Sequence, residues 1–169
     1  MFDTASLLMT TPELILSVSG LVLMMIAAYA GDRSAVLVGW LAIAGLTVAG
    51  LSFACQSIPH GDAFDGLYRA DAFAAFAKVL IYGSAAASIL VAPRFFATGN
   101  GGAIRAEYPV LILFACVGMG MMVSATDMLT LYVGLELNSL AAYILASFMR
   151  QDSRSAEAGL KYFVLGALA

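Results

Sequence analysis

The sequence predicts an all-α fold, a polytopic bundle of transmembrane helices, and three observations support this prediction. Hydrophobic residues make up 62% of the 169 residues and charged residues only 11%, and the mean hydropathy is +0.94. A soluble domain contains about 25% charged residues, so this chain is better suited to a bilayer. Several apolar runs are also long enough to cross a hydrocarbon core, which takes about 20 residues per helix.

The apolar runs define the expected helices in order. Five complete helices are expected at about residues 13–31, 35–54, 71–92, 108–125 and 128–149. A sixth, at about residues 156–169, is incomplete, because the 13 residues from Glu157 onward give only about 20 Å of helix. Either the chain ends inside the membrane or it is the front part of a longer protein.

Arginine residues indicate the topology of the expected helices. The segments after the first, third and fifth helices contain five of them, Arg33, Arg94, Arg105, Arg150 and Arg154. The opposite side has one basic residue and several acidic or neutral ones, namely Arg69 with Asp3, Glu13, His60, Asp62, Asp65 and Asp127. The positive-inside rule therefore places the arginine loops in the cytoplasm and the N-terminus on the periplasmic or equivalent side.

Sequence signals for metals and cofactors are missing. Cys55 and Cys116 form no CxxC pair, and the glycine-rich stretch at residues 99–102 lacks the Lys-Ser/Thr of a phosphate loop. We therefore expect no metal site, no cofactor-binding site and no nucleic-acid patch in this chain.

Three ionisable residues fall inside the apolar runs, at Lys78, Glu136 and Lys161. An unpaired charge at the centre of a transmembrane helix costs at least about 2.5–3.5 kcal/mol, so such residues face a protein or water-lined interior and often mark a function. Glu136 is the deepest of the three. It lies 14 residues before Arg150, which is about 21 Å of helix.

Helical spacing places Glu136 on a polar face. Tyr132, Glu136, Ser139 and Tyr143 follow at i, i+4, i+7 and i+11 and share one side of the helix. Hydroxyl groups around a carboxylate can order water and pass protons, as in the relays of proton pumps. The alternative is a neutral Glu136 that is hydrogen-bonded to a neighbouring helix and only stabilises packing.

The two lysines each have two interpretations. Lys161 either reaches toward Glu136, directly or through water, or extends its side chain to the cytoplasmic interface. Lys78 shares a face with Asp71 and Tyr82 and belongs either to a second polar path or to a buried contact with a neighbouring helix, which we favour. Asp127 is expected to cap the helix that begins at Met128.

Three sequence elements together resemble a known family. They are RADAFAAF at residues 69–76, TLYVGLELNSLAAYIL at 130–145 and RSAEAGLKYFVLGALA at 154–169. In this order and spacing they are similar to the N-terminal part of the subunit N family, antiporter-like membrane subunits of the proton-pumping NADH:quinone oxidoreductase, respiratory complex I. The resemblance covers nearly all of residues 1–169, which are then the N-terminal portion of one membrane domain.

The resemblance implies an antiporter-like fold with about fourteen transmembrane helices, of which about six are present here. It matches Glu136 to the carboxylate of the fifth helix, which pairs with lysine in the proton pathway, and Lys161 to a lysine of the sixth helix that tunes it. The family's other pathway lysines and both broken helices would lie beyond Ala169. Lys78 matches no motif of the family.

The implied function is proton transfer driven by NADH oxidation and quinone reduction elsewhere in a larger complex. FMN, iron–sulfur clusters, NADH and quinone would belong to partner subunits. The expected partners are other antiporter-like and small membrane subunits, together with lipid, in a bacterial inner or mitochondrial inner membrane. Two alternatives remain: a cation/proton antiporter or membrane-bound hydrogenase subunit of the same family, and a structural membrane module with no ion path.

Overall fold

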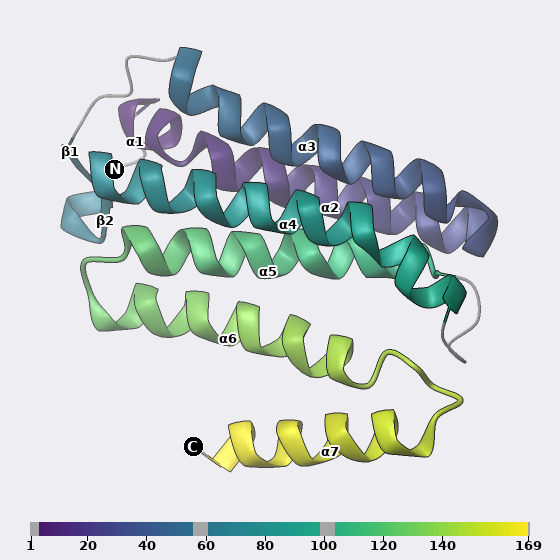
Figure 1. The fold of residues 1–169 in the computed structure, drawn as a ribbon. Helices are drawn as coiled ribbons and strands as arrows, with labels where there is room; N and C mark the ends of the chain where they lie inside the picture. The colour runs from purple at the N-terminus through teal and green to yellow at the C-terminus, as the bar shows by residue number, and fades with distance from the viewer. Residues whose placement is uncertain (1–3, 56–60, 99–103, 169) are drawn as a thin grey trace.

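The computed structural model describes residues 4–55, 61–98 and 104–168. Its helices are α1 (Thr4–Met9), α2 (Thr11–Ala30), α3 (Ala35–Cys55), α4 (Ala72–Thr98), α5 (Glu107–Ser124), α6 (Met128–Ala146) and α7 (Ser153–Leu168). A 3₁₀ turn, η1 (Gly31–Ser34), joins α2 to α3. The long helices run antiparallel to their sequence neighbours (Figure 1), which confirms the all-α helix bundle.

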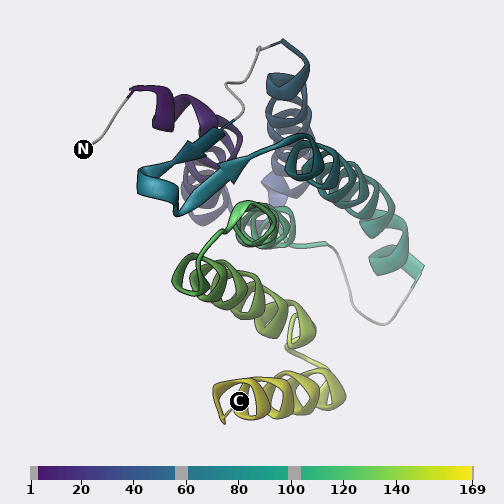
Figure 2. The same cartoon turned by 90° about the vertical axis from the view of Figure 1, so that its left-hand side faces the viewer.

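Helix α5 lies at the centre of the bundle. It packs against α2, α3, α4 and α6, while α7 packs on α6 at the edge. Viewed along the helices, α5 is surrounded by these neighbours and α7 is the outermost helix (Figure 2). The main core is formed where α2, α3, α4 and α5 meet, around Leu16, Val38, Leu46 and Leu113.

Four segments of the described residues are long and apolar enough to cross a membrane. They are Thr11–Ser52, which contains α2 and most of α3, Ala72–Ala97, Glu107–Ser124 and Met128–Ala146. Large apolar side chains such as Leu21, Trp40 and Phe76 are more than half exposed on the outer faces of the helices. These faces suit contact with lipid or with further helices, so the chain is a multi-pass membrane protein.

Two helix ends differ from those expected. Helix α4 passes through Pro93 and ends at Thr98, whereas the apolar run ends at Ala92. Helix α6 ends at Ala146, and residues 147–152 form the turn to α7. There the Ser155 hydroxyl donates to the Ala146 carbonyl (2.9 Å) and accepts from the Met149 amide (3.3 Å).

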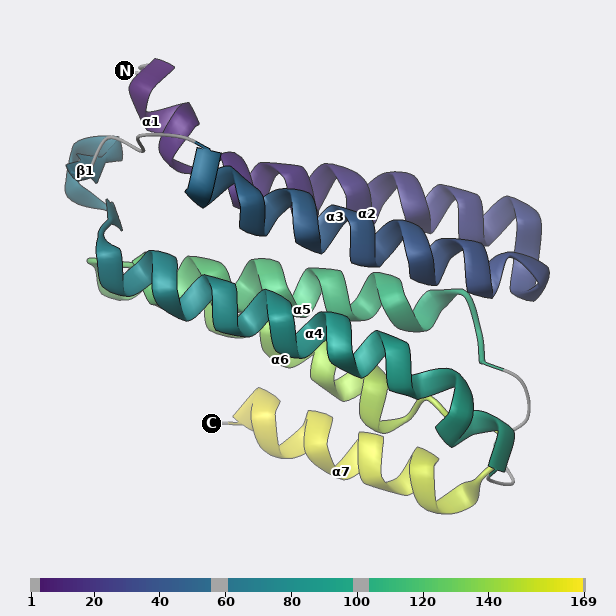
Figure 3. The ribbon, with the colours of Figure 1, turned by 45° about the horizontal axis from the view of Figure 1, so that its top comes forward.

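A β-hairpin between α3 and α4 was not predicted from the sequence, which indicated only a connecting loop. Strands β1 (Gly61–Ala63) and β2 (Tyr68–Ala70) are antiparallel, with Asp62 opposite Arg69. The short 3₁₀ turn η2 (Phe64–Gly66) joins them. Thr126, in the α5–α6 turn, donates hydrogen bonds to the carbonyls of Gly66 and Leu67. The hairpin therefore covers one end of the bundle (Figure 3).

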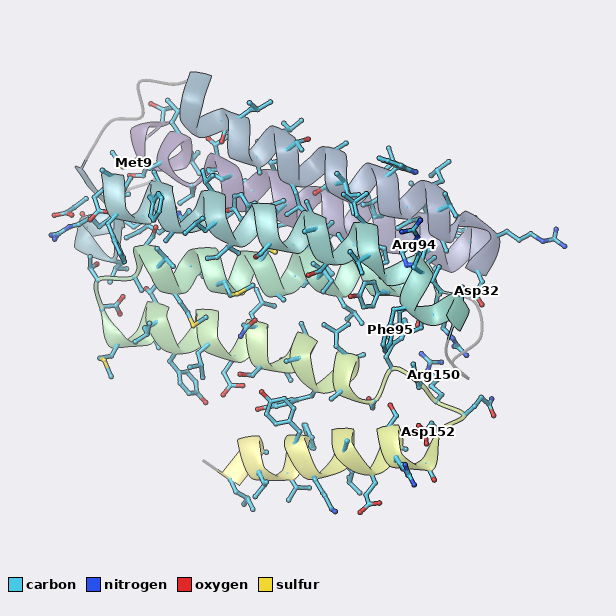
Figure 4. All side chains as sticks on the ribbon, in the orientation of Figure 1. Met9, Asp32, Arg94, Phe95, Arg150 and Asp152 are labelled. Carbon is cyan, nitrogen blue, oxygen red and sulfur yellow. The ribbon has the colours of Figure 1, made fainter. Side chains whose placement is uncertain are left out.

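Helices α2, α4 and α6 end at the other end of the bundle (Figure 1). Asp32, Arg94, Arg150 and Asp152 lie there, whereas Met9 lies at the hairpin end (Figure 4). Arg150 bridges two of these segments by an ion pair with Glu107 at the start of α5 (3.2 Å). The arginine-bearing loops therefore share one end, as the topology prediction requires.

Asp127 caps α6, as predicted. Its carboxylate accepts hydrogen bonds from the backbone amides of Leu129 (3.0 Å) and Thr130 (3.3 Å). Hydrogen bonding by Thr130 holds the pKa of the Asp127 carboxyl below its usual range. The cap therefore stays ionised at neutral pH, where a negative charge is favourable at a helix N-terminus.

Glycines allow α5 and α6 to approach closely. A methyl group on Gly118 would lie 2.6 Å from the carbonyl oxygen of Gly134 and 2.7 Å from the amide nitrogen of Asn138. Both atoms are backbone and cannot move aside without shifting α6. Small residues at such crossings let membrane helices pack backbone to backbone.

We expect Gly118→Ala to lower the free energy of unfolding by about 1–3 kcal/mol, because the added methyl group overpacks this crossing. Gly83→Ala in α4 is the matched control, since a methyl group there would meet nothing within 4 Å. Unfolding of the detergent-solubilised protein measures both. Equal stability of the two variants would contradict the close α5–α6 contact.

Candidate functional site

The predicted polar face of α6 is only partly covered. Glu136 is half-buried, and Tyr132, one turn earlier, is 60% exposed. The side chains of these two residues interact. At the other end of the face, the ring of Tyr143 packs edge-on against Tyr162 of α7, with 4.7 Å between ring centroids. Helix α7 thus covers only the end of the face nearest the arginine loops.

Lys161 does not pair with Glu136 in this structure. Its ammonium group lies 2.5 Å from the Glu157 carboxylate, one turn earlier on α7, and both side chains are more than 60% exposed. Within the described residues, no ion pair joins Lys161 to Glu136. Their joint role in a proton pathway remains a prediction.

Lys78 is one of the most deeply buried side chains of the described residues, at 2% exposure. Its ammonium nitrogen lies 2.5 Å from Oε1 of Glu13, which is also buried. Glu13 is in the first turn of α2 and Lys78 is near the start of α4, so both lie at the hairpin end. Lys78 is therefore buried against a neighbouring helix, which is the interpretation that the sequence favoured.

Tyr68 of the hairpin completes this buried cluster. Lys78 donates a hydrogen bond to the Tyr68 hydroxyl (2.6 Å), which itself donates to Oε2 of Glu13 (3.1 Å). The ammonium group also lies 4.8 Å from the centre of the Tyr68 ring. Burial, followed by the charge of Glu13, raises the pKa of the Tyr68 hydroxyl. Tyr68 therefore stays neutral and can both donate and accept.

Further hydroxyl groups surround the Glu13–Lys78–Tyr68 cluster. Tyr82 and Ser124 are almost fully buried, and neither hydroxyl has a hydrogen-bond partner among the described residues. A methyl group on Gly120 would lie 3.0 Å from Oε1 of Glu13 and 3.4 Å from the Tyr82 hydroxyl. The missing side chain of Gly120 therefore lets α5 lie close to the carboxylate and to the Tyr82 hydroxyl.

Asp71, a possible secondary site residue, has a local structural contact. Its carboxylate accepts a hydrogen bond from the Ala74 amide (2.7 Å) and so caps the start of α4. The charge of Asp71 also acts on Lys78. Asp71 therefore lies beside the cluster and contributes to its field.

Sequence reasoning identified Lys78 but not its partner, because Glu13 was counted only among the charged residues on the side opposite the arginine loops. The available signal was position: Glu13 follows Pro12 at the start of an apolar run, and Lys78 lies a short distance into another run. The runs begin at the same side of the membrane, so the two residues lie at similar depth. The pairing itself depends on how α2 and α4 pack.

The cluster can hold a proton in more than one place. Carboxylate, ammonium and phenol are joined by short polar contacts in a buried environment, where charged forms lose hydration. Glu136 presents a second carboxylate, with one hydroxyl-bearing neighbour and an open side. No group of three or more His, Cys, Asp or Glu residues in the described part of the chain could hold a metal ion.

Comparison with known proteins relates the chain to one family. Residues 125–169, which contain α6 and α7, match the family model described as NADH:quinone oxidoreductase/Mrp antiporter, TM. The chain is also similar to proteins named NADH-quinone oxidoreductase subunit N. It is 65% identical to that of Rhizorhabdus wittichii over 98% of this chain, and 55% identical to that of Erythrobacter litoralis. It spans about a third of these relatives, 34% of each.

We expect Lys78→Met to lower the free energy of unfolding by about 3–5 kcal/mol, because removal of one partner leaves a buried, uncompensated charge on Glu13. The double variant Glu13→Gln/Lys78→Met should recover most of this loss, because it leaves no charge. Unfolding in detergent measures the difference.

Asp62→Asn is the control for this comparison. It breaks the ion pair of Asp62 with Arg69 (2.8 Å), in which both side chains are at least half exposed, and it should change stability little. A double variant no more stable than Lys78→Met would contradict the expected origin of the loss.

Proposed function

Because the chain is a relative of the subunit N proteins over 98% of its length, we propose that it forms part of a proton-translocating membrane subunit of NADH:quinone oxidoreductase. The observation that supports this most directly is Glu136. It provides a carboxylate in the middle of α6, within residues 125–169 that match the antiporter-like family. Ionisable residues at such depth are typical of proton paths.

In this proposal, Glu136 accepts and releases a proton along the polar face of α6. Tyr132 interacts with it, and Ser139 and Tyr143 follow on the same face. Each hydroxyl can accept a proton from one neighbour while it donates another. The open side of this face would be covered by helices that correspond to the rest of the relatives' length.

The energy would come from partner subunits. NADH oxidation on FMN, electron transfer through iron–sulfur clusters and quinone reduction would take place there, and this chain would contribute neither redox group. Its partners would be other antiporter-like and small membrane subunits, with lipid around them. The membrane would be a bacterial or mitochondrial inner membrane, with the arginine loops in the cytoplasm or matrix and the N-terminus on the opposite side.

A cation/proton antiporter subunit is the second candidate, because the matching family model includes Mrp antiporters. Both candidates use Glu136 in the same way. Co-purification of the protein with NADH dehydrogenase subunits would favour the oxidoreductase subunit over the antiporter subunit. Absence of the protein from a purified antiporter complex would favour the same candidate. A structural module with no ion path is the third reading, and the following variant tests it.

We expect Glu136→Gln to reduce NADH-driven proton pumping by roughly tenfold or more in the assembled complex, because Gln cannot exchange a proton. Quenching of a pH-sensitive dye in inverted membrane vesicles measures pumping, and the rate of NADH oxidation is recorded alongside. Glu107→Gln is the control, since it removes an exposed carboxylate at the start of α5, on the side of the arginine loops. Unchanged pumping in an assembled Glu136→Gln complex would exclude the relay.

We expect Lys161→Ala to lower pumping less than Glu136→Gln, because Lys161 is exposed and paired with Glu157. Its charge acts on Glu136 only if the side chain turns or the covering helices change its surroundings. The same vesicle assay compares the two variants, with Glu157→Gln as the control for loss of the α7 ion pair. A loss equal to or larger than that of Glu136→Gln would reverse this ranking of the two residues.

A further inference from the structure

We propose that Glu13, Lys78 and Tyr68 form a second proton-binding site, at the hairpin end of the bundle and separate from Glu136. The inference rests on the proposed function, because a proton-translocating subunit is where such a site would act. Its ligand is the proton, exchanged between the carboxylate and the amine. Neither the sequence elements that resemble the family nor residues 125–169 include Glu13, Lys78 or Tyr82.

The contacts of the cluster form a closed triangle. Lys78 reaches Oε1 of Glu13 at 2.5 Å and the Tyr68 hydroxyl at 2.6 Å, and that hydroxyl reaches Oε2 of Glu13 at 3.1 Å. Each side of the triangle is a donor–acceptor contact of hydrogen-bond length. A proton can therefore move from Lys78 through the Tyr68 hydroxyl to Glu13 without a large displacement of the side chains.

Burial reduces the preference of the Glu13–Lys78 pair for its charged form over its neutral form. The exposed fractions of Glu13, Lys78 and Tyr68 are 6%, 2% and 5%. In water a carboxylate and an ammonium are strongly favoured over their neutral forms, but both charged groups lose hydration when they are buried. The neutral pair can keep hydrogen bonds through the Tyr68 hydroxyl and avoids that cost, so the two forms come closer in free energy. A small change in the surroundings is then enough to exchange them.

Proton transfer within the cluster breaks as many bonds to hydrogen as it forms. The Lys78 ammonium gives a proton to the Tyr68 hydroxyl as that hydroxyl gives its own proton to Oε2 of Glu13, so one N–H bond and one O–H bond break while two O–H bonds form. The ion pair becomes an amine and a carboxylic acid, and Tyr68 is again a neutral phenol. No electrons are transferred and the net charge of the pair stays zero. The carboxylic acid can then give its proton to water, and the amine can take up the next one.

Helix α5 lies directly against the cluster, because Gly120 has no side chain and faces Oε1 of Glu13 and the Tyr82 hydroxyl. Tyr82 and Ser124, which ends the same helix, add two buried hydroxyl groups around the cluster. On the other side, Tyr68 belongs to the hairpin whose Asp62 and Arg69 are exposed. The cluster therefore lies beside the hairpin end of the bundle.

Groups on neighbouring segments also act on the cluster. Besides its three members, these titratable groups are Asp71, which caps the start of α4, Tyr82 on α4 and, through Tyr82, Cys116 on α5. The charge of Asp71 favours the ammonium form of Lys78 and so opposes proton transfer to Glu13.

The test compares variants in the assembled membrane complex. Glu13→Gln should reduce the number of protons translocated per NADH oxidised by roughly tenfold, because an amide cannot exchange a proton. Infrared difference spectra of the working complex should show a protonated-carboxyl band that is absent in Glu13→Gln. Normal translocation by Glu13→Gln, or spectra identical to those of the unaltered complex, would overturn the proposal. Asp62→Asn removes an exposed carboxylate at the same end and is the control.

The double variant Glu13→Gln/Lys78→Met separates a proton site from a structural contact. If the pair only stabilises packing, the double variant should restore translocation together with stability, and that result would overturn the proposal. If the pair exchanges protons, stability should recover while translocation stays low. Should Glu13→Gln fail to assemble, Tyr68→Phe decides, because it keeps the ring and the ion pair. It should lower translocation at least roughly twofold, and unchanged translocation would overturn the proposal.

Proton pumping by Glu136→Gln distinguishes failure of the proposed function from failure of the proposed second site. Loss of pumping in Glu136→Gln with normal pumping in Glu13→Gln would retain the proposed function and remove the second site. Normal pumping in Glu136→Gln would remove the proposed path along α6. The infrared band of Glu13 would still report proton exchange at the cluster in that case.

Discussion

The absence of water from the hydrocarbon core constrains every other feature of this protein. A backbone or charged group that leaves water must find its partner within the protein. Helices satisfy the backbone, and Lys78 satisfies its charge through Glu13 and Tyr68. The hairpin and the Asp127 cap satisfy polar groups at one end of the bundle. The polar contacts are therefore concentrated at a few places, one of which is the Glu13–Lys78–Tyr68 cluster.

Glycine spacing in α5 explains how polar groups on different helices come close. Gly118 faces Gly134 and Asn138 of α6, whereas Gly120 faces Glu13 of α2 and Tyr82 of α4. Helix α5 therefore presents one glycine toward α6 and another toward α2 and α4. The α6 face with Glu136 and the buried Glu13–Lys78–Tyr68 cluster lie around α5, and its close packing sets their positions.

The two ionisable regions differ in how complete they are. The cluster is enclosed by α2, α4, α5 and the hairpin, so its contacts are formed within the described residues. Glu136 is half-buried, and the start of its polar face is exposed at Tyr132. Since the chain spans about a third of its relatives, further helices would complete the surroundings of Glu136. The proposed path along α6 would therefore need helices that correspond to the rest of the relatives' length, whereas the contacts of the buried pair are formed within the described residues.

The sequence by itself determined the helices, because hydrophobic runs of membrane length and the cost of unpaired backbone in lipid allow few other structures. It also indicated that Lys78 and Glu136 are exceptional, since an ionisable group in an apolar run is expensive. The hairpin could not be predicted, because its short strands depend on contact with Thr126 in a distant turn. Only the tertiary structure paired Lys78 with Glu13 and turned Lys161 toward Glu157. Spacing along one helix defines a face, but the neighbour that meets that face depends on how the helices pack.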